Sequence, residues 1–287
     1  MARKIRKPAE AESEDEVRRA VREHYKELAL QEKPCCGSGK STMCGCGLYS
    51  DSELGVVPSE SSSVSAGCGN PTAIAGLKEG MTVVDLGSGG GIDAFLSSKK
   101  VGPKGKVYGI DATPEMILRA RKTARENGFD NVEFRLGEIE HIPLPDGCAD
   151  VIISNCVINL SPQKQQVFDE AFRILRPGGR LAVSDIVLLK ELPESLKADM
   201  AAWSSCVSGA VLEGEYLGAI KKAGFEQVKV EERAVYDHEQ LSSYIGGSSE
   251  PTAVTSFSGK KDRMDLSGTV ASSKVTAVKP AGKERLR

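Results

Sequence analysis

The feature that most constrains the fold is the stretch VVDLGSGGG at residues 83–91, where an apolar run ends in an acid and then breaks into alternating glycines. This pattern is typical of a buried strand that enters a glycine loop, whose backbone amides approach a nucleotide-like ligand. The spacing is G-x-G-x-G, whereas dinucleotide folds use G-x-G-x-x-G to seat a pyrophosphate on a helix N-terminus. Asp85, just before the loop, would repel a pyrophosphate but suits a cationic amino-acid group. The loop therefore predicts a cofactor site and disfavours a dinucleotide.

Strand and helix patterns alternate from this stretch onward. The predicted strands cover residues 82–85, 106–110, 132–136, 148–154 and 180–186, and the helices between them cover 92–99, 114–127 and 162–175. Thr113 is a predicted N-cap, and Pro114 occupies the first helical position. Alternation at this spacing indicates βαβ units and a mostly parallel α/β sheet.

The regions before and after this alternation have other patterns. A helix is predicted over 13–31, where Ser13 and Glu16 have the form of a capping box, and a short helix over 51–55. The later part contains predicted helices at 193–207 and 214–223, predicted strands at 225–236 and 271–278, and a link at 246–268 without a periodic apolar face. Because an irregular link joins the two late strands, we expect them to be antiparallel to each other.

Two acidic positions strengthen the prediction of a nucleotide-like ligand. Asp111 ends the second strand about 20 residues beyond the loop, where an acid hydrogen-bonds ribose hydroxyls. Glu138 and Ile139 follow the third strand, a position suited to an adenine ring. The alternative is that the acids are solvated and the glycines only turn the chain. The coincidence of three matches at strand carboxyl ends favours a binding site.

Composition and charge exclude several classes of function. The 287 residues are enough for one large α/β domain with extensions or for two small domains. A formal net charge of −2 gives no basic surface for nucleic acid, and no apolar run approaches the roughly 20 residues of a membrane span. The basic segment at 1–7 is not followed by the apolar region of a secretory signal. We expect a cytoplasmic protein.

Eight cysteines are the second unusual feature, and a reducing cytosol disfavours a disulfide framework. Cys35, Cys36, Cys44 and Cys46 fall within twelve positions, which indicates thiol chemistry or soft-metal binding. Adjacent cysteines and C-x-C differ from the C-x-x-C pairs of zinc sites. A thiol arm that captures a soft ligand or relays electrons is favoured over a disordered tail.

The stretches DLGSGGG at 85–91, GID at 109–111 and RPGG at 176–179 resemble class I S-adenosylmethionine-dependent methyltransferases. The resemblance implies a Rossmann-like seven-stranded sheet in the order 3-2-1-4-5-7-6 with strand seven antiparallel. It also implies that residues 71–190 form the cofactor-binding core, that 191–287 add acceptor-covering helices and the last two strands, and that 1–70 precede the core as a helix and Cys-rich segment. The implied cofactor-binding residues are Asp85, Gly87, Ser88 and Gly89 towards the methionine moiety, Asp111 at the ribose, Glu138 and Ile139 beside adenine, Thr113 and Met116 in the adenosine pocket, and Asn155.

Three further cysteines suggest the acceptor. Cys156 follows the fourth strand, where class I enzymes open towards the methyl group, and Cys206 lies in the segment that typically covers the acceptor. Cys68 lies just before the first strand. A soft centre such as trivalent arsenic binds thiolates, normally up to three. Each cysteine alone is also explained as a buried apolar residue, and for Cys148 we keep that interpretation.

The stretches GCGNP at 67–71, GEIE at 137–140 and SNCVINL at 154–160, with Cys35-Cys36 and Cys206 after Trp203, resemble the arsenite S-adenosylmethionine methyltransferases. The resemblance implies that Cys156 and Cys206 bind trivalent arsenic. It further implies that Cys68 and the Cys35-Cys36 pair join in binding or in a disulfide relay. Cys44 and Cys46 are additional candidates.

The predicted activity is therefore methylation of arsenite and methylarsenite for detoxification, by a monomer that uses glutathione or thioredoxin as reductant. Trivalent arsenic carries no proton to remove, so no general base is required. One alternative is a methyltransferase of a small organic acceptor with structural cysteines. Another is a non-catalytic arsenic- or metal-binding module, which the intact glycine loop argues against.

Overall fold

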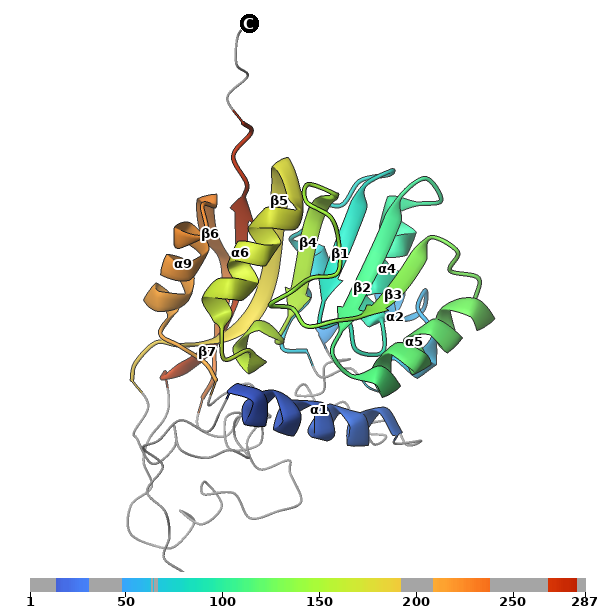
Figure 1. The fold of residues 1–287 in the computed structure, drawn as a ribbon, viewed down its shortest axis with the longest axis horizontal. Helices are drawn as coiled ribbons and strands as arrows, with labels where there is room; N and C mark the ends of the chain where they lie inside the picture. Colours follow the sequence, from blue (N-terminus) through green and yellow to red (C-terminus); the bar gives the residue numbers. More distant parts are fainter. Residues whose placement is uncertain are drawn as a thin grey trace, which may run out of the picture.

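The computed structural model describes residues 14–30, 48–62, 64, 67–191, 209–237 and 268–282. Its centre is a seven-stranded sheet in the order β3-β2-β1-β4-β5-β7-β6 (Figure 1). The strands are β1 (Thr82–Leu86), β2 (Lys106–Asp111), β3 (Val132–Leu136), β4 (Ala149–Asn155), β5 (Leu175–Leu188), β6 (Glu226–Val235) and β7 (Val270–Val278). β7 runs antiparallel to both β5 and β6, and the other pairs are parallel. The predicted fold class and strand order are confirmed.

Helices cover both faces of the sheet. The α-helices are α1 (Glu14–Leu30), α2 (Asp51–Leu54), α3 (Ser59–Ser62), α4 (Ile92–Val101), α5 (Pro114–Glu126), α6 (Lys164–Ile174) and α9 (Glu213–Lys222), and the 3-10 helices are η2 (Pro71–Ala73) and η3 (Ile158–Leu160). Successive side chains of β1 point to opposite faces, so Val84 packs in the core under α6 and α9, and Val83 packs in the core under α4 and α5.

The strand after α6 begins earlier than predicted. β5 starts at Leu175, five positions before the expected Arg180, because Leu175 already pairs with Ala149. The register then shifts between Ala149 and Val151, with Gly178 at φ 79°, and pairing resumes at Arg180 with Val151. Residues 177–179 therefore form an irregularity within β5.

Capping also differs from the prediction. Thr113 is at the N-cap of α5, but its side chain makes no capping hydrogen bond. A complete capping box occurs instead at α2, where Ser50 and Glu53 exchange side-chain and backbone hydrogen bonds. The expected box at Ser13, the helix at 193–207 and almost all of the link at 246–268 lie outside the described residues.

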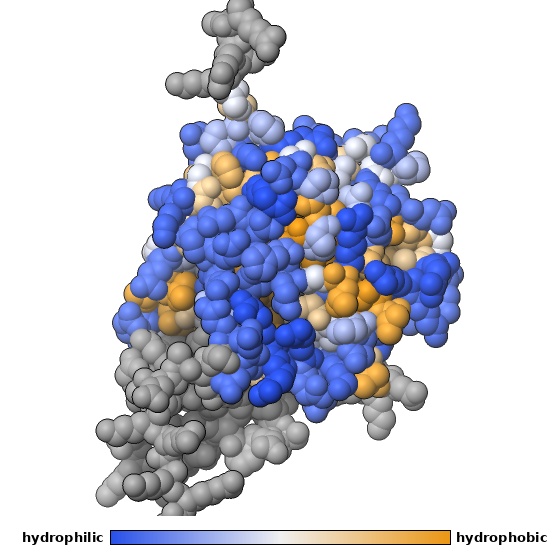
Figure 2. All heavy atoms as spheres, viewed as in Figure 1, coloured by the Kyte–Doolittle hydropathy of each residue, from blue (hydrophilic) through white to orange (hydrophobic). Residues whose placement is uncertain are grey.

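The face of the molecule in Figure 2 is mostly hydrophilic, with smaller apolar areas between the polar residues. Within the parts of the chain that the structure describes, no helix combines the length and the apolar character needed to cross a membrane. In Figure 1, α1 lies across the end of the sheet towards which the parallel strands point. This end of the sheet contains the candidate site.

Candidate active site

One pocket at the carboxyl ends of β1, β2 and β4 contains every residue that was predicted to bind the cofactor. These ten residues are Asp85, Gly87, Ser88, Gly89, Asp111, Thr113, Met116, Glu138, Ile139 and Asn155. They come from four separate segments of the chain, which the parallel strand order brings to one edge. Cys156 lines the same pocket.

The glycines of the loop after β1 are required by its geometry. Gly87, Gly89 and Gly91 have φ values of 68°, 48° and 92°, in the left-handed region that favours glycine. A Cβ atom at Gly87 would overlap the side chain of Val157, so the absence of that atom lets the glycine loop pack against the segment that carries Cys156. At Gly89, a Cβ atom would meet no heavy atom of the described residues within 4 Å. The loop therefore packs tightly against the protein at Gly87 and leaves space beside Gly89.

Asp111 shapes the loop from β2. Its Oδ2 accepts a hydrogen bond from the Gly89 amide at 2.9 Å, and its Oδ1 accepts one from the Thr113 amide at 2.8 Å. Burial raises the pKa of this carboxyl, and the two amide donors oppose that rise. The Thr113 side chain also hydrogen-bonds this carboxyl, and the lone pairs that remain can accept a ligand hydroxyl.

Asp85 has unused acceptor capacity in the pocket. Its carboxylate accepts a hydrogen bond from the Ala94 amide, but its Oδ2 is buried without a partner among the described residues, as is Ser88 Oγ. Burial raises the pKa of Asp85 well above its usual range, and the nearby Asp93 adds to the rise. A buried acceptor without a donor is costly, so this arrangement suits a cationic donor from a ligand.

The two cysteines that flank β1 and β4 in the sequence meet at the pocket. Cys68 and Cys156 are joined by a disulfide with their Cα atoms 5.8 Å apart, although 88 positions separate them. Both side chains are buried. Cys156 has a φ of 58°, which is uncommon for a residue with a side chain, and its amide donates to the Ser184 carbonyl at 2.8 Å. The sequence analysis disfavoured a framework of disulfides, but the structure contains this one bridge. The bridge joins two of the predicted arsenic ligands.

The other cysteines are divided between two groups. Cys35, Cys36, Cys44, Cys46 and Cys206 lie outside the described residues. Cys148 is a free thiol, half-buried at the edge of the core, in agreement with its interpretation as an apolar residue. Among the residues that are described, no three His, Cys, Asp or Glu side chains are grouped to hold a metal ion.

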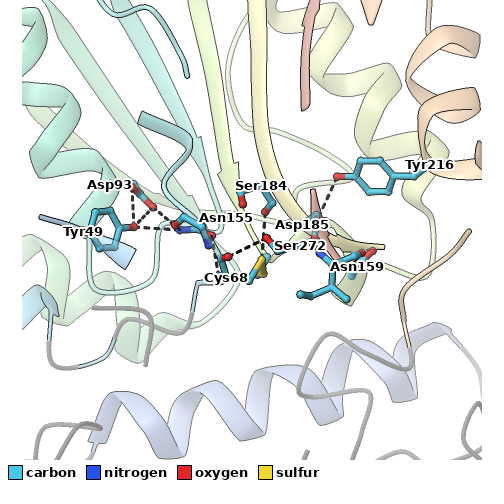
Figure 3. The surroundings of a disulfide bond; sticks show 12 residues. Tyr49, Cys68, Asp93, Asn155, Asn159, Ser184, Asp185, Tyr216 and Ser272 are labelled. Atoms are coloured by element: carbon cyan, nitrogen blue, oxygen red, sulfur yellow. Dashed lines mark hydrogen bonds between the residues drawn. A yellow bond between two sulfur atoms is a disulfide. The ribbon is translucent and has the colours of Figure 1, made fainter. Parts of the chain in front are cut away.

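A polar cluster that sequence reasoning missed lies beside the disulfide (Figure 3). The Tyr49 hydroxyl is 2.9 Å from both carboxylate oxygens of Asp93, and the Asn155 Nδ2 donates to Asp93 Oδ2 at 3.1 Å. Burial raises the pKa of Asp93 to about 6, and the hydrogen bonds from Asn155 and Tyr49 oppose that rise. Tyr49 is 44 positions from Asp93 and lies in no recognisable motif, so nothing in the sequence signalled the contact.

α1 closes the outer side of the pocket. Arg18, Arg22 and Tyr25 from this helix line it. Arg22 Nη1 lies 3.4 Å from Glu138 Oε1, and Arg18 Nε lies 3.6 Å from Glu140 Oε1. The helix that the sequence predicted over 13–31 therefore contributes to the lining of this pocket.

Comparisons with known proteins show which proteins the chain is similar to. A family model described as a methyltransferase domain matches residues 77–233. The chain is 43% identical over 230 residues to an arsenite methyltransferase of Halobacterium salinarum, which covers 75% of this chain and 59% of that protein. It is 35% identical over 226 residues to an arsenite methyltransferase of Mus musculus, covering 74% and 58%. The chain thus spans less than two thirds of the length of these relatives.

A solved structure gives a similar result at the level of the fold. The crystal structure of an arsenic (III) S-adenosylmethionine methyltransferase from Chlamydomonas reinhardtii matches with a TM-score of 0.63 and 33% sequence identity. The match covers 80% of this chain and 72% of that one.

Proposed function

This chain belongs to the class I S-adenosylmethionine-dependent methyltransferases, in the family of the arsenite methyltransferases, and we propose that it methylates trivalent arsenic held by its own thiolates. The observation that carries the proposal is the meeting of Cys68 and Cys156 at the donor pocket. A thiol pair in this place suits a soft acceptor.

The pocket fits the methyl donor by the chemistry of its free acceptors. Asp85 Oδ2 and the remaining lone pairs of Asp111 would receive an ammonium group and ribose hydroxyls, and Glu138 with Ile139 would flank the adenine. S-adenosylmethionine, when bound, supplies an electrophilic sulfonium methyl group. We also propose Gly87, Ser88, Gly89, Thr113 and Met116 as binding residues, because they line the same pocket.

The thiolates act by orientation. In the reduced protein, Cys68 and Cys156 replace hydroxide on trivalent arsenic and fix the direction of its lone pair, with Cys206 as the proposed third ligand. Holding the two reactants in line accounts for most of the expected acceleration. No side chain has to remove a proton, because the arsenic lone pair forms the new bond. This agrees with the absence of histidine from the lining of the described pocket.

Turnover requires electrons. Addition of a methyl cation raises arsenic formally from +3 to +5, and the return to +3 takes two electrons. The sulfurs of Cys68 and Cys156 lose their protons as water when they replace hydroxide on arsenic. When the two sulfurs then form the disulfide, both arsenic–sulfur bonds break and two electrons stay on arsenic, which returns to +3. We propose that glutathione or thioredoxin then reduces this disulfide, with the cysteines at 35, 36, 44 and 46 as relay candidates. Detoxification of arsenic in the cytoplasm, by a monomer, is the proposed setting.

Replacing Cys156 by serine tests the role of the thiol. We expect Cys156→Ser to reduce arsenite methylation by more than about 100-fold, because one arsenic ligand and the lone-pair alignment are lost. Titration calorimetry should give a Kd for S-adenosylhomocysteine within about 3-fold of the wild-type value. Cys148→Ser, the matched substitution at the free thiol, should leave both quantities unchanged. Wild-type arsenite methylation by Cys156→Ser would refute the proposal that the Cys156 thiolate holds the arsenic.

A further inference from the structure

The carboxamide of Asn155 links the donor pocket to the loop that carries Cys68. Asn155 is the last residue of β4 and directly precedes Cys156. Its Oδ1 accepts hydrogen bonds from the amides of Cys68 at 3.1 Å and Gly69 at 3.2 Å. Its Nδ2 donates to the Gly69 carbonyl at 2.7 Å. One side chain therefore binds the backbone on both sides of the Cys68 thiol (Figure 3).

The same Nδ2 reaches the polar cluster on the other side. It lies 3.1 Å from both the Tyr49 hydroxyl and Asp93 Oδ2. Tyr49 and Asp93 are buried, and Asp93 lines the donor pocket. These contacts fix the rotamer of Asn155, because a rotated carboxamide would leave the Cys68 and Gly69 amides facing an NH₂ group.

The Cys68 loop is shaped to fit this carboxamide. A Cβ atom at Gly67 would overlap the Asn155 side chain, and a Cβ atom at Gly69 would overlap the Ser184 hydroxyl. The loop is held from its other side by Ser272, whose Oγ donates to the Cys68 carbonyl at 3.0 Å. The two glycines allow the loop to lie close against the ends of β4 and β5.

We propose that Asn155 is a positioning residue for the thiol pair, and that its carboxamide serves the Cys68 loop in preference to the methyl donor. The family resemblance implied that Asn155 belongs to the cofactor-binding residues. The structure gives its polar atoms five protein contacts, which leaves little capacity for a ligand. The inference deepens the proposed function, since the thiols that it positions are the proposed arsenic ligands.

The test measures the equilibrium between the Cys68–Cys156 disulfide and the two thiols in dithiothreitol buffers. Oxidised dithiothreitol takes two electrons and two protons from the thiols, and the peptides are quantified by mass spectrometry after alkylation. Because a fixed loop raises the effective concentration of one thiol at the other, we expect Asn155→Ala to lower the constant for disulfide formation by about tenfold. That change corresponds to about 30 mV.

Two variants accompany this measurement. Asn155→Asp keeps the shape and the acceptor towards Cys68 but places a second oxygen against the Gly69 carbonyl and Asp93, so it should lower the same constant even if Asn155→Ala fails to fold. Asn131→Asp is the matched control, because Asn131 also uses both ends of its carboxamide, towards Ser98 and Gly102, before β3. It should leave the disulfide equilibrium unchanged.

The Kd for S-adenosylhomocysteine, measured on the same variants, separates the two roles of Asn155. A donor affinity within about 3-fold of wild type, together with the shifted disulfide equilibrium, supports the positioning role. Weakened donor binding with an unchanged disulfide equilibrium overturns it and restores Asn155 to the cofactor-binding residues. Neither measurement involves arsenic or methyl transfer, so failure of the proposed function would be seen separately as a lack of arsenite methylation.

Discussion

At the scale of single residues, the site is organised by buried carboxyl groups whose charge a ligand would stabilise. Asp85 and Asp93 lie in the pocket with raised pKa values, and burial is the main cause for both. Asp111, the third acid, is fixed by two backbone amides. The pocket therefore suits a positively charged group. When no ligand is bound, ionisation of these buried carboxyl groups costs free energy.

This cost predicts a pH dependence of donor binding. Asp93, with a pKa of about 6, binds a proton below that pH, and the ammonium group of a bound ligand favours the ionised carboxylate. We expect the affinity for S-adenosylhomocysteine to rise between pH 5 and pH 7, with proton release on binding. Calorimetry in buffers of different ionisation enthalpy measures both effects. Asp93→Asn should flatten the profile, and a flat profile in the wild-type protein would contradict this account.

At the scale of elements, α1 closes the donor pocket through its arginines. Arg18 lines the pocket and approaches Glu140, a buried carboxylate that also accepts a hydrogen bond from Ser161 at 2.6 Å. Arg18 also forms ion pairs with Glu14 and Asp15 in the first turn of α1. Without Arg18, Glu140 would lose its nearby positive charge and would repel these two acidic residues. α1 would then cover the pocket less firmly.

We expect Arg18→Ala to increase the dissociation rate of S-adenosylhomocysteine by about tenfold with a smaller effect on association, as is usual for changes at one interface. Stopped-flow displacement gives both rates. Arg19→Ala removes an exposed arginine from the same helix and is the matched control. Equal dissociation rates in the two variants would show that α1 does not retain the ligand.

Much of the element order was predictable, because apolar periodicity and turn residues are local signals. β3 was predicted with its exact bounds, and α1 to within one residue at each end. β5 was predicted too short, because its pairing with Ala149 across the irregularity at 177–179 depends on the neighbouring strand. The predicted cofactor-binding residues were placed from strand ends, but the cluster of Tyr49, Asp93 and Asn155 depends on tertiary packing that no local pattern encodes.

At the scale of the whole molecule, a buried acid outside the donor pocket makes stability depend on pH. Asp185 in β5 accepts a hydrogen bond from the buried Tyr216 of α9 at 3.1 Å, and burial raises its pKa to about 7. The folded protein therefore binds this proton more tightly than the unfolded chain, in which aspartates have a pKa of about 3.9. The stabilisation from Asp185 is complete below that value and is lost as the pH rises through about 7.

Asp185→Asn removes this titration. From pH 5 to pH 8, the free energy of unfolding of the variant should rise by about 2–3 kcal/mol relative to wild type, as urea unfolding at the two pH values would measure. Asp130→Asn, at an exposed aspartate, is the control and should show no such change. A constant difference between Asp185→Asn and wild type would mean that Asp185 is ionised throughout this range.

The whole molecule joins a methyl-donor pocket to a thiol pair, and we propose that arsenic is the methyl acceptor. The most direct measurement is production of S-adenosylhomocysteine by the full chain with S-adenosylmethionine and thiol reductant, with and without arsenite, together with speciation of arsenic. We predict that S-adenosylhomocysteine forms only with arsenite and in proportion to the methyl groups found on arsenic. No arsenite-dependent S-adenosylhomocysteine from protein that binds the methyl donor would contradict the claim.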